Sequence, residues 1–522
     1  MLASSQVLPT LLRLRAEEEP ERVFLQHVDG TSWTYAELER NVLSWARGLA
    51  SCGVEAGDRV VVMLPNSLEL VAVWMAVARL GAIEVPPNTA YRGRFLEHVL
   101  VNAGARLGVV APEFLPLFLE LGDRVPALER LIVLGDVPER PGVVRAASIL
   151  GRNSEAPLGL IAPEESDISM ILYTSGTTGA SKGVLIPWGQ VHATAEALPP
   201  IEGRDEHDVF YSPYPLFHMS GKLAVCAAAL LRGRIVIRAQ FSTGEFWSDI
   251  DRFGCTTTLL IGGVPVFLAK LPERPDDAEH PLRNVVLAPP PEDAEAFCLR
   301  FGLRACFPFN MTELSVPLST GWDQELVFRG SVGGPRPGYQ VRIVDDLDRQ
   351  LPPGEIGEIV VRADEPWRLM AGYWAMEDKT VEAWRNLWFH TGDVGRADPD
   401  GAFFFLDRKK DAIRRRGENI SSMELEAEIN EFEPVAESAV VGVPSEVGEE
   451  DVKAFVVPKP GVRFEAPDLI AFLEGRIPAF MLPRYVAVVD SLPKTPTEKV
   501  RKTELRERET DARTWERPSA RR

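Results

Sequence analysis

Residues 173–184 read YTSGTTGASKGV and combine glycines, hydroxyl side chains and one lysine in a short segment. Glycine lets a backbone approach a ligand closely, and backbone amides and hydroxyl groups can donate to phosphate oxygens. Lys182 adds a positive point charge, and the segment comes directly after an apolar run at 170–172. These features predict a phosphate-binding loop that follows the end of a strand.

The spacing of the lysine argues against a Walker A loop. That loop places its lysine directly after the last glycine, in the pattern G-x-x-x-x-G-K-[ST]. Here Lys182 follows Gly179 by three positions. Composition alone is about equally consistent with a phosphate-binding loop and with a flexible polar turn. The ordered string T-S-G-T-T-G-x-x-K-G favours the phosphate-binding loop.

Alternating strands and helices must position this loop. Runs of β-branched residues predict buried strands at 59–63, 107–110, 234–237 and 257–261. Residues 68–80 have the apolar spacing of a helix. Strand–helix alternation of this kind predicts parallel sheets, and therefore an α/β fold.

The pattern changes after about residue 330. Short strands separated by Pro-Gly and Asp-Gly turns predict an antiparallel sheet or barrel. The basic segment DRKKDAIRRRGEN, at 407–419, is the expected boundary between a large domain over 1–406 and a small α+β domain over 407–522. In the small domain, helices and strands are expected at 422–432, 438–443, 452–458, 467–476 and 485–489.

Length and charge agree with this organisation. A chain of 522 residues is too long for one ordinary core. The net charge of −19 argues against nucleic acid or an anionic membrane as the main partner. The five cysteines are scattered and form no CxxC pair, so neither a disulfide framework nor a zinc site is predicted.

No membrane or targeting segment is expected. The N-terminus becomes acidic quickly and lacks a long apolar stretch. The apolar window at 68–85 is interrupted by Glu69, Arg79 and Glu84, so it predicts a buried helix followed by a strand. We therefore expect a cytoplasmic protein without stable membrane insertion, and a homodimer is left open.

Four further segments follow the loop in the order known from one family. They read FNMTE, WFHTGDVG, DRKKDAIRRRGENISSMELE and PKTPTEKVRK, at 309–313, 388–395, 407–426 and 493–502. With the loop, they resemble the motifs of the adenylate-forming superfamily of acyl-CoA synthetases, firefly-type luciferases and peptide-synthetase adenylation domains. The resemblance runs from about residue 33 to about residue 504, and is strongest to bacterial carnitine-type, resin-acid or fatty-acid CoA ligases.

The resemblance implies a large domain with parallel αβ sheets and a distorted antiparallel β-barrel subdomain, followed by a small mobile α+β domain with its hinge near Lys410. It also implies an AMP-forming acid–thiol ligase that uses ATP, Mg²⁺ and coenzyme A. A carboxylate resists a thiol because its leaving group would be an oxide. Such enzymes first form an acyl-adenylate with release of pyrophosphate, and then pass the acyl group to coenzyme A with release of AMP.

The same resemblance assigns roles around the nucleotide. It implies that Glu313 holds Mg²⁺, that Thr312 bonds the α-phosphate, and that Phe309 stacks on adenine. Asp393 is expected to accept both ribose hydroxyls, with Arg408 nearby. The implied ATP and AMP set is Thr174, Ser175, Gly176, Thr177, Thr178, Gly179, Lys182, Ala288, Pro289, Phe309, Asn310, Met311, Thr312, Asp393, Arg408 and Lys499.

Lys499 is the residue expected to carry the adenylation step, because a cation between the carboxylate oxygen and the α-phosphate stabilises the developing charge. The implied catalytic set is Lys499, Thr312, Glu313 and His218. The implied acyl pocket is His218, Met219, Gly262, Gly263 and Asn310. The implied coenzyme A site is Arg414, Arg415, Arg416 and Gly417. The small apolar residues after Met219 favour a medium-chain, long-chain or polycyclic apolar acid.

Two positions depart from the family pattern. Asn310 and Glu498 stand where most relatives have glycine. The carboxylate of Glu498 can pair with Lys499 and so weaken its action in the adenylation step. A variant specialised for thioester formation is therefore left open. A stand-alone adenylation enzyme that loads a carrier protein is also left open, as is a nucleotide sensor that has lost catalysis.

Overall fold

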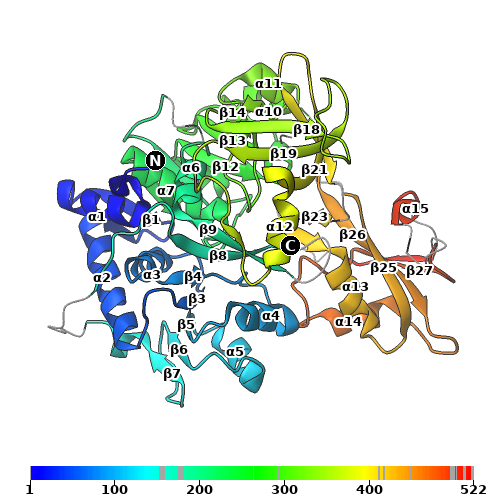
Figure 1. Cartoon of the computed structure of the whole chain (residues 1–522), viewed down its shortest axis with the longest axis horizontal. Coiled ribbons are helices and arrows are strands. Elements are labelled where there is room, and N and C mark those ends of the chain that lie inside the picture. The colour runs from blue at the N-terminus through cyan, green and yellow to red at the C-terminus, as the bar shows by residue number, and fades with distance from the viewer. Residues whose placement is uncertain are drawn as a thin grey trace. The chain divides into compact units, whose positions relative to one another are not determined.

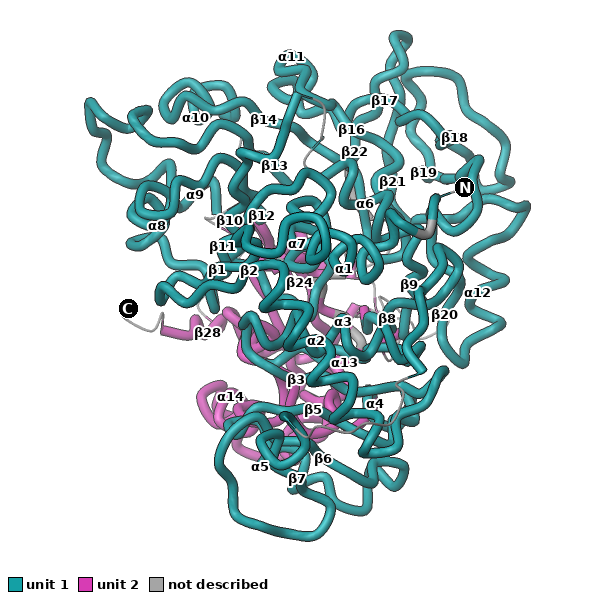
Figure 2. The backbone as a smooth tube through the Cα atoms, turned by 90° about the vertical axis from the view of Figure 1, so that its left-hand side faces the viewer, with its two compact units in different colours: residues 1–89, 99–173, 183–407 teal, residues 90–98, 174–182, 408–522 magenta. Residues whose placement is uncertain are grey.

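A computed structural model of the chain is shown in Figure 1. It describes residues 2–151, 159–174, 181–198, 200, 203–262, 264–288, 290, 293–408, 412–415, 418–445, 448–493, 500, 502–508 and 513–518. The contacts divide the chain into two compact units (Figure 2). Unit 1 comprises residues 1–89, 99–173 and 183–407, and unit 2 comprises residues 90–98, 174–182 and 408–522.

One mainly parallel sheet of unit 1 contains two of the predicted strands with their predicted bounds, at 234–237 and 257–261. Its described strands follow the order β14 (Arg304–Cys306), β13 (Asn284–Ala288), β12 (Thr257–Ile261), β10 (Val209–Ser212), β11 (Arg234–Ile237), β1 (Val23–His27) and β2 (Ser32–Thr34). The strands run parallel except at β2, which pairs antiparallel with β1.

A second sheet carries the two ends of the predicted phosphate loop. Its described strands follow the order β20 (Gly372–Tyr373), β9 (Lys182–Pro187), β8 (Ile168–Thr174), β4 (Ile83–Val85), β3 (Arg59–Met63), β5 (Leu107–Val110), β6 (Arg130–Val133) and β7 (Val143–Arg145). The pairs from β4 to β7 are parallel, which confirms the α/β prediction.

The helix α3 (Leu68–Arg79) connects the cores of the two sheets. Every residue in it except Glu69 is buried, as expected for a helix that is apolar on all sides. It contacts β3 and β4 of the second sheet and β1 of the first. The window at 68–85 is therefore a buried helix followed by a strand, as predicted, and every helix within the described ranges is too short or too polar to span a bilayer.

The other helices of unit 1 pack around these sheets (Figure 1). They are α1 (Leu8–Glu18), α2 (Tyr35–Ser51), α5 (Leu115–Leu121), α6 (Trp188–Ala195), α7 (Met219–Leu231), α8 (Phe246–Phe253), α9 (Val264–Ala269), α10 (Ala294–Phe301), α11 (Gln324–Phe328) and α12 (Glu377–Ala383). The α2 helix begins with a capping box between Thr34 and Glu37. The helix α4 (Gly93–Ala103) is divided between the two units, because residues 90–98 belong to unit 2.

The predicted antiparallel region is also confirmed. The strands β18 (Tyr339–Val344), β19 (Gly357–Ala363), β21 (Phe389–Ala397) and β22 (Phe403–Arg408) form one sheet in that order. The short strands β15 (Pro308–Phe309), β16 (Leu318–Ser319) and β17 (Gly334–Pro335) form another antiparallel sheet.

Unit 2 contains the sheet β25 (Val435–Pro444), β26 (Glu450–Pro458), β27 (Tyr485–Val488) and β28 (Thr514–Glu516), covered by α13 (Ser422–Asn430) and α14 (Ala466–Leu473). Both helices end two or three residues earlier than predicted. In α14 the backbone leaves the helical conformation at Glu474, whose ψ is 128°, and Gly475 follows with a φ of +82°. The hairpin of β23 (Ala412–Arg415) and β24 (Glu418–Ser421) precedes α13, and α15 (Lys502–Arg506) follows β27.

Candidate functional site

The turn after β15 carries the predicted Thr-Glu pair, and helix α6 holds it in place. The fully buried Gln190 of α6 donates from Nε2 to the carbonyl oxygens of Thr312 and Leu314, at 2.8 and 2.9 Å. The amide of Leu314 donates to the carbonyl of Met311 at 3.0 Å, which closes the turn. The backbone around Thr312 is therefore fixed by a side chain more than one hundred residues earlier in the chain.

Glu313 is buried, at 5% exposure, and its carboxylate is oriented by a phenol. The Tyr373 hydroxyl donates to Oε1 of Glu313 at 3.0 Å. Burial, reinforced by the nearby carboxylate, raises the pKa of Tyr373, so its hydroxyl stays protonated and can donate at neutral pH. The amide of Met370 donates to the carbonyl of Glu313 at 2.9 Å and anchors the backbone.

This carboxylate suits Mg²⁺ held together with a nucleotide. Mg²⁺ is usually bound through one or two carboxylates, and takes its other ligands from phosphates and water. Within the described residues, no cluster of three or more histidine, cysteine or acidic side chains could enclose a metal. A single buried carboxylate such as that of Glu313 is the kind of protein ligand that fits Mg²⁺ when phosphates and water supply the other ligands.

Asp393 lies in β21 and is buried, at 4% exposure. Its amide donates to Oγ1 of Thr391 at 3.0 Å, and that hydroxyl donates to the carbonyl of Ile359 at 2.7 Å. Gly392 between them has a φ of +71°, a conformation that favours glycine. Its amide donates to Oε1 of Glu358 at 3.1 Å. Strand β19 thus fixes the backbone that carries Asp393.

Phe309 has an aromatic neighbour that the sequence did not reveal. Phe309 is buried at the end of β15, and Phe405 in β22 is 41% exposed. Their ring centroids are 6.3 Å apart, with planes tilted by 34°. The pair places two aromatic side chains together where only Phe309 was predicted.

The carboxyl ends of two parallel strands bring Gly262 and Ala288 together. Ile261 of β12 pairs with Ala288 of β13, and the amide of Gly262 donates to the carbonyl of Ala288 at 2.9 Å. Ligands bind preferentially outside the carboxyl ends of such strands. The structure thus joins one predicted acyl-pocket residue to one predicted nucleotide residue.

His218 and Met219 lie at the start of α7. His218 is the N-cap residue, and its carbonyl accepts from the amides of Gly221 and Lys222, both at 3.2 Å. A Cβ at Gly221 would lie 2.3 Å from the carbonyl oxygen of Pro215, so only glycine fits there. The close approach of the chain before α7 therefore fixes the position of His218.

The next turn of α7 contains an ion pair that the sequence did not predict. Lys222 and Glu84 are both fully buried, with Nζ and Oε2 2.7 Å apart. Nζ also lies 3.9 Å from the ring centroid of Trp74. Burial lowers the pKa of Lys222 and raises that of Glu84, and their mutual attraction opposes both changes. The pair ties α7 to β4 across the core.

The two ends of the phosphate loop lie on neighbouring strands. Thr174 is the last residue of β8, and Lys182 is the first residue of β9. The side chain of Arg408, at the end of β22, is not described. The remaining predicted positions outside the described residues are Ser175, Gly176, Thr177, Thr178, Gly179, Gly263, Pro289, Lys410, Arg416, Gly417 and Lys499.

Within unit 2, the two described arginines of the predicted coenzyme A site differ. Arg415 is 5% exposed, donates from Nη1 to the carbonyls of Phe480 and Leu482, and lies 2.8 Å from Asp451. The side chain of Arg414 is less buried, and its amide donates to Glu450 at 2.9 Å. Arg415 therefore stabilises unit 2 itself, and its predicted contact with coenzyme A stays a prediction.

Also within unit 2, Ser181 beside the loop is held by two side chains. Nε2 of His98 lies 2.8 Å from its carbonyl oxygen. Its amide donates to the carboxyl group of Glu424, which lies in α13. Burial raises the pKa of Glu424 to about 8 against this hydrogen bond. Glu424 is therefore largely protonated at neutral pH.

Glu424→Gln should flatten the pH dependence of stability. The folded state holds this proton up to a pH of about 8, whereas an unfolded carboxyl loses it near 4.5. In the wild type, this group should therefore lower the free energy of unfolding by up to about 1.4 kcal/mol per pH unit as the pH rises through that window, and should have no further effect above it. In Glu424→Gln this contribution to the slope should be absent. Chemical denaturation of wild type and variant between pH 5 and 9 measures the slope. The exposed Glu433→Gln is the matched control, and an unchanged slope in Glu424→Gln would contradict the assignment.

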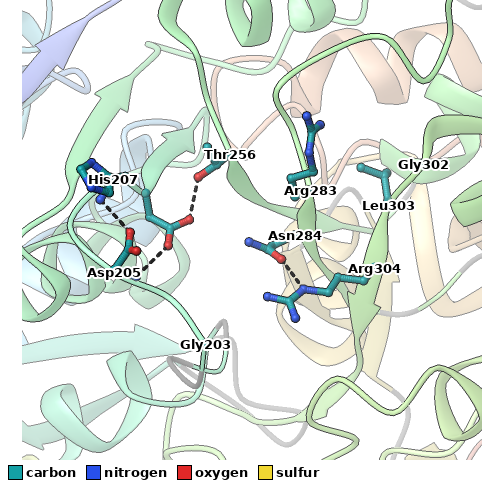
Figure 3. A pocket seen from close by; sticks show the side chains of 10 residues that line it. Gly203, Asp205, His207, Thr256, Arg283, Asn284, Gly302, Leu303 and Arg304 are labelled. Atoms are coloured by element: carbon teal, nitrogen blue, oxygen red, sulfur yellow. Dashed lines mark hydrogen bonds between the residues drawn. The ribbon is translucent and has the colours of Figure 1, made fainter.

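A separate cleft of about 540 Å³ lies at the amino ends of β10, β12 and β13 (Figure 3). Its polar groups bond to one another: Oγ1 of Thr256 donates to Asp208 at 2.7 Å, and Nε of Arg304 donates to Asn284 at 2.6 Å. None of the predicted site residues lines this cleft. The predicted residues Gly262 and Ala288 lie instead at the carboxyl ends of β12 and β13.

Comparison with known proteins finds two family models that match this chain. The model of the AMP-binding enzyme family matches residues 12–374, and that of the AMP-binding enzyme C-terminal domain matches residues 424–499. A crotonobetaine/carnitine–CoA ligase from Salmonella paratyphi C is 31% identical over 486 residues, which are 91% of this chain and 93% of that relative.

Two solved structures share the fold over almost the whole chain. An o-succinylbenzoate CoA synthetase from Bacillus subtilis, bound to a product analogue, has a TM-score of 0.84 at 25% identity and covers 97% of this chain and 99% of its own. An amide bond synthetase from Marinactinospora thermotolerans has a TM-score of 0.83 at 28% identity and covers 95% of this chain and 99% of its own.

Proposed function

Because this chain belongs to the AMP-binding enzyme family, we propose that it is an AMP-forming ligase that joins a carboxylic acid to coenzyme A. The observation that carries the proposal is the turn of Thr312 and the buried Glu313, held by Gln190 and Tyr373 at the family's own motif. The relative named as a CoA ligase, which this chain matches over 93% of its length, supports coenzyme A as the acceptor rather than a carrier protein.

In the first half-reaction, an oxygen of the carboxylate attacks the α-phosphorus of ATP. The bond from that phosphorus to the bridging oxygen breaks, and pyrophosphate leaves with the electron pair. The residues proposed to hold the phosphates are the loop from Thr174 to Lys182 and the hydroxyl of Thr312. Lys499 neutralises the charge that develops between the two reactants, where a fixed cation is most effective.

Glu313 is the residue that would hold Mg²⁺, which neutralises phosphate charge when it is bound. The role of the protein is to aim this carboxylate. Tyr373 donates to Oε1 of Glu313, and Oε2 would face the ion.

The nucleoside is proposed to lie between β15, β21 and β22. Phe309 and Phe405 offer aromatic faces to adenine, and Ala288 and Pro289 border its edge. Asp393 accepts from the two ribose hydroxyls. An ionised carboxylate can take two such donors at once.

The acyl pocket is proposed to lie beside the start of α7. His218, Met219, Gly262, Gly263 and Asn310 are its assigned residues. The helix continues with Leu223, Ala224 and further small apolar residues, all buried. A carboxylic acid with an apolar acyl chain suits such a wall better than one whose acyl chain carries a charge, because an unpaired charge there would lose its hydration.

In the second half-reaction, the small domain over 407–522 is proposed to turn about Lys410. This movement withdraws Lys499 and brings Arg414, Arg416 and Gly417 to the acyl-adenylate. The thiolate of coenzyme A then attacks the acyl carbon. The bond to the phosphate oxygen of AMP breaks, and a thioester forms.

The nature of the acid and the acceptor can be tested together. Linear acids of increasing chain length, polycyclic acids and carnitine-like zwitterions should be offered with ATP, Mg²⁺ and one acceptor at a time. We expect an apolar acid to give the highest kcat/KM, and coenzyme A to be preferred to a carrier-bound phosphopantetheine or a simple amine. Preference for the zwitterion would contradict the apolar pocket, and preference for an amine would contradict the acceptor.

A further inference from the structure

Three acidic or basic side chains and a histidine gather near the turn that carries Asp393. We call Asp348, Glu358, Arg385 and His390 the polar quartet. Nη2 of Arg385 lies 3.1 Å from Oδ1 of Asp348 and 3.4 Å from Oε2 of Glu358. His390 lies between the same two carboxylates, with Nδ1 3.4 Å from Oε2 of Glu358 and Nε2 3.8 Å from Oδ1 of Asp348.

The centre of the quartet is shielded from water. The side chains of Glu358 and His390 are each 5% exposed, and that of Asp348 is 14% exposed. Arg385, in a short helical turn at Arg385–Leu387, closes the outer side at 42% exposure. Hydrogen bonds from Arg385 lower the pKa of Asp348 below its usual range, which keeps that carboxylate charged. Charges buried in this way are retained only where they are paired.

The pairing of β19 with β21 explains why these side chains meet. Val360 is opposite His390 in the register, and the register shifts between Glu358 and Val360. Glu358 is two residues before Val360 on the same strand, so regular alternation already places its side chain on the face where His390 lies. The extra residues of the irregularity lie on β21, between His390 and Val394, in the segment that contains Gly392 and Asp393.

Glu358 connects the quartet to that turn. Its Oε2 faces His390 and Arg385, while its Oε1 accepts the hydrogen bond from the amide of Gly392. A charged acceptor makes this bond stronger than a neutral one would. Gly392 is in the positive-φ conformation, so this bond helps to fix the peptide directly before Asp393.

We propose that Glu358, oriented by the hydrogen bond from Arg385 and lying beside His390, is a positioning residue that aims Asp393 at the ribose of ATP. The inference rests on the proposed function, because it assumes that Asp393 binds the ribose hydroxyls. In this proposal, Glu358 acts on nucleotide binding through the Gly392 amide, so its loss should mainly weaken binding of ligands that carry those hydroxyls.

Glu358→Gln keeps the shape and an acceptor for Gly392, but loses the charge that faces His390 and Arg385. We expect the variant to bind AMP about tenfold more weakly, in line with the loss of one charge-assisted bond. Its affinity for 2′,3′-dideoxy-AMP should change less than about twofold, since that ligand gives Asp393 nothing to accept. In turnover, KM for ATP should rise while kcat at saturating ATP is nearly unchanged.

Isothermal titration with AMP and 2′,3′-dideoxy-AMP measures this difference. Glu355→Gln is the matched control, because Glu355 is exposed and lies three residues earlier in the chain. It should bind both ligands as the wild type does. His390→Asn provides a second variant, expected to give the same selective loss with a smaller magnitude.

The outcomes separate the inference from the function beneath it. If wild type binds both nucleotides equally and Asp393→Ala changes neither affinity, the ribose assignment fails and the inference falls with it. If wild type prefers AMP and Asp393→Ala abolishes that preference, the assignment holds. In that case, an equal loss for both ligands in Glu358→Gln, or no loss at all, overturns the inference alone.

Discussion

Lys499→Ala should slow formation of the acyl-adenylate by about 10²–10³-fold, the usual effect of removing one fixed electrostatic stabiliser from a transition state. The same variant should convert preformed acyl-adenylate and coenzyme A to thioester at nearly the wild-type rate, because the proposed second step does not use this lysine. Rapid-quench measurement of the adenylate, and a separate assay starting from synthetic acyl-adenylate, measure the two steps independently.

A matched control excludes a general effect of removing positive charge from the C-terminal region. Lys459 is exposed in unit 2, and Lys459→Ala should leave both half-reactions unchanged. Adenylation at full speed in Lys499→Ala would refute the proposed mechanism. Equal losses in both half-reactions would mean that Lys499 serves structure rather than the first step.

Glu313→Gln should have the second-largest effect, lowering kcat/KM for ATP by about 10²-fold. The amide can still accept from Tyr373 but cannot carry the charge that an ion needs. The Mg²⁺ concentration that half-saturates ATP binding should rise about tenfold, which titration without any acid present can measure. Tyr373→Phe should give a milder loss, because it removes only the hydrogen bond that orients the carboxylate.

The Mg²⁺ titration decides whether Glu313 serves the ion. An unchanged Mg²⁺ dependence in Glu313→Gln, together with a normal unfolding curve, would contradict its role as a metal ligand. Glu355→Gln again serves as the control for the same substitution at an exposed position.

Much of the fold could be predicted because its signals are local. The strands at 59–63, 107–110, 234–237 and 257–261 have the predicted bounds, since each is a short apolar or β-branched run that turn residues delimit. Helix ends were less predictable. The ends of α13 and α14 depend on where the backbone leaves the helical conformation, which hydrophobic spacing does not specify.

In the candidate site, too, some residues could be predicted from local motifs and others could not. Ordered motifs predict Thr312, Glu313 and Asp393 as site residues. The residues that hold them were missed, because each partner is distant in the sequence: Gln190 bonds the Thr312 turn, and Tyr373 bonds Glu313. A buried polar residue on an apolar element is the one signal that such partners leave in a sequence, and it does not name the partner.

The ion pair of Lys222 and Glu84 illustrates the same limit. Each residue alone interrupts an apolar run, and neither run indicates which residue is the partner. Their contact depends on α7 packing across β4, which follows from the assembly of two sheets rather than from any local pattern. Buried charges of this kind become interpretable only once both elements are placed.

The central claim is that this chain activates a free carboxylic acid with ATP and passes it to coenzyme A. The direct test is to incubate the purified protein with ATP, Mg²⁺, coenzyme A and a range of apolar acids, and to quantify every product by mass spectrometry. The account predicts AMP, pyrophosphate and acyl-CoA in equal amounts, all dependent on the acid. Formation of ADP and phosphate, or the absence of AMP with every acid, would contradict it.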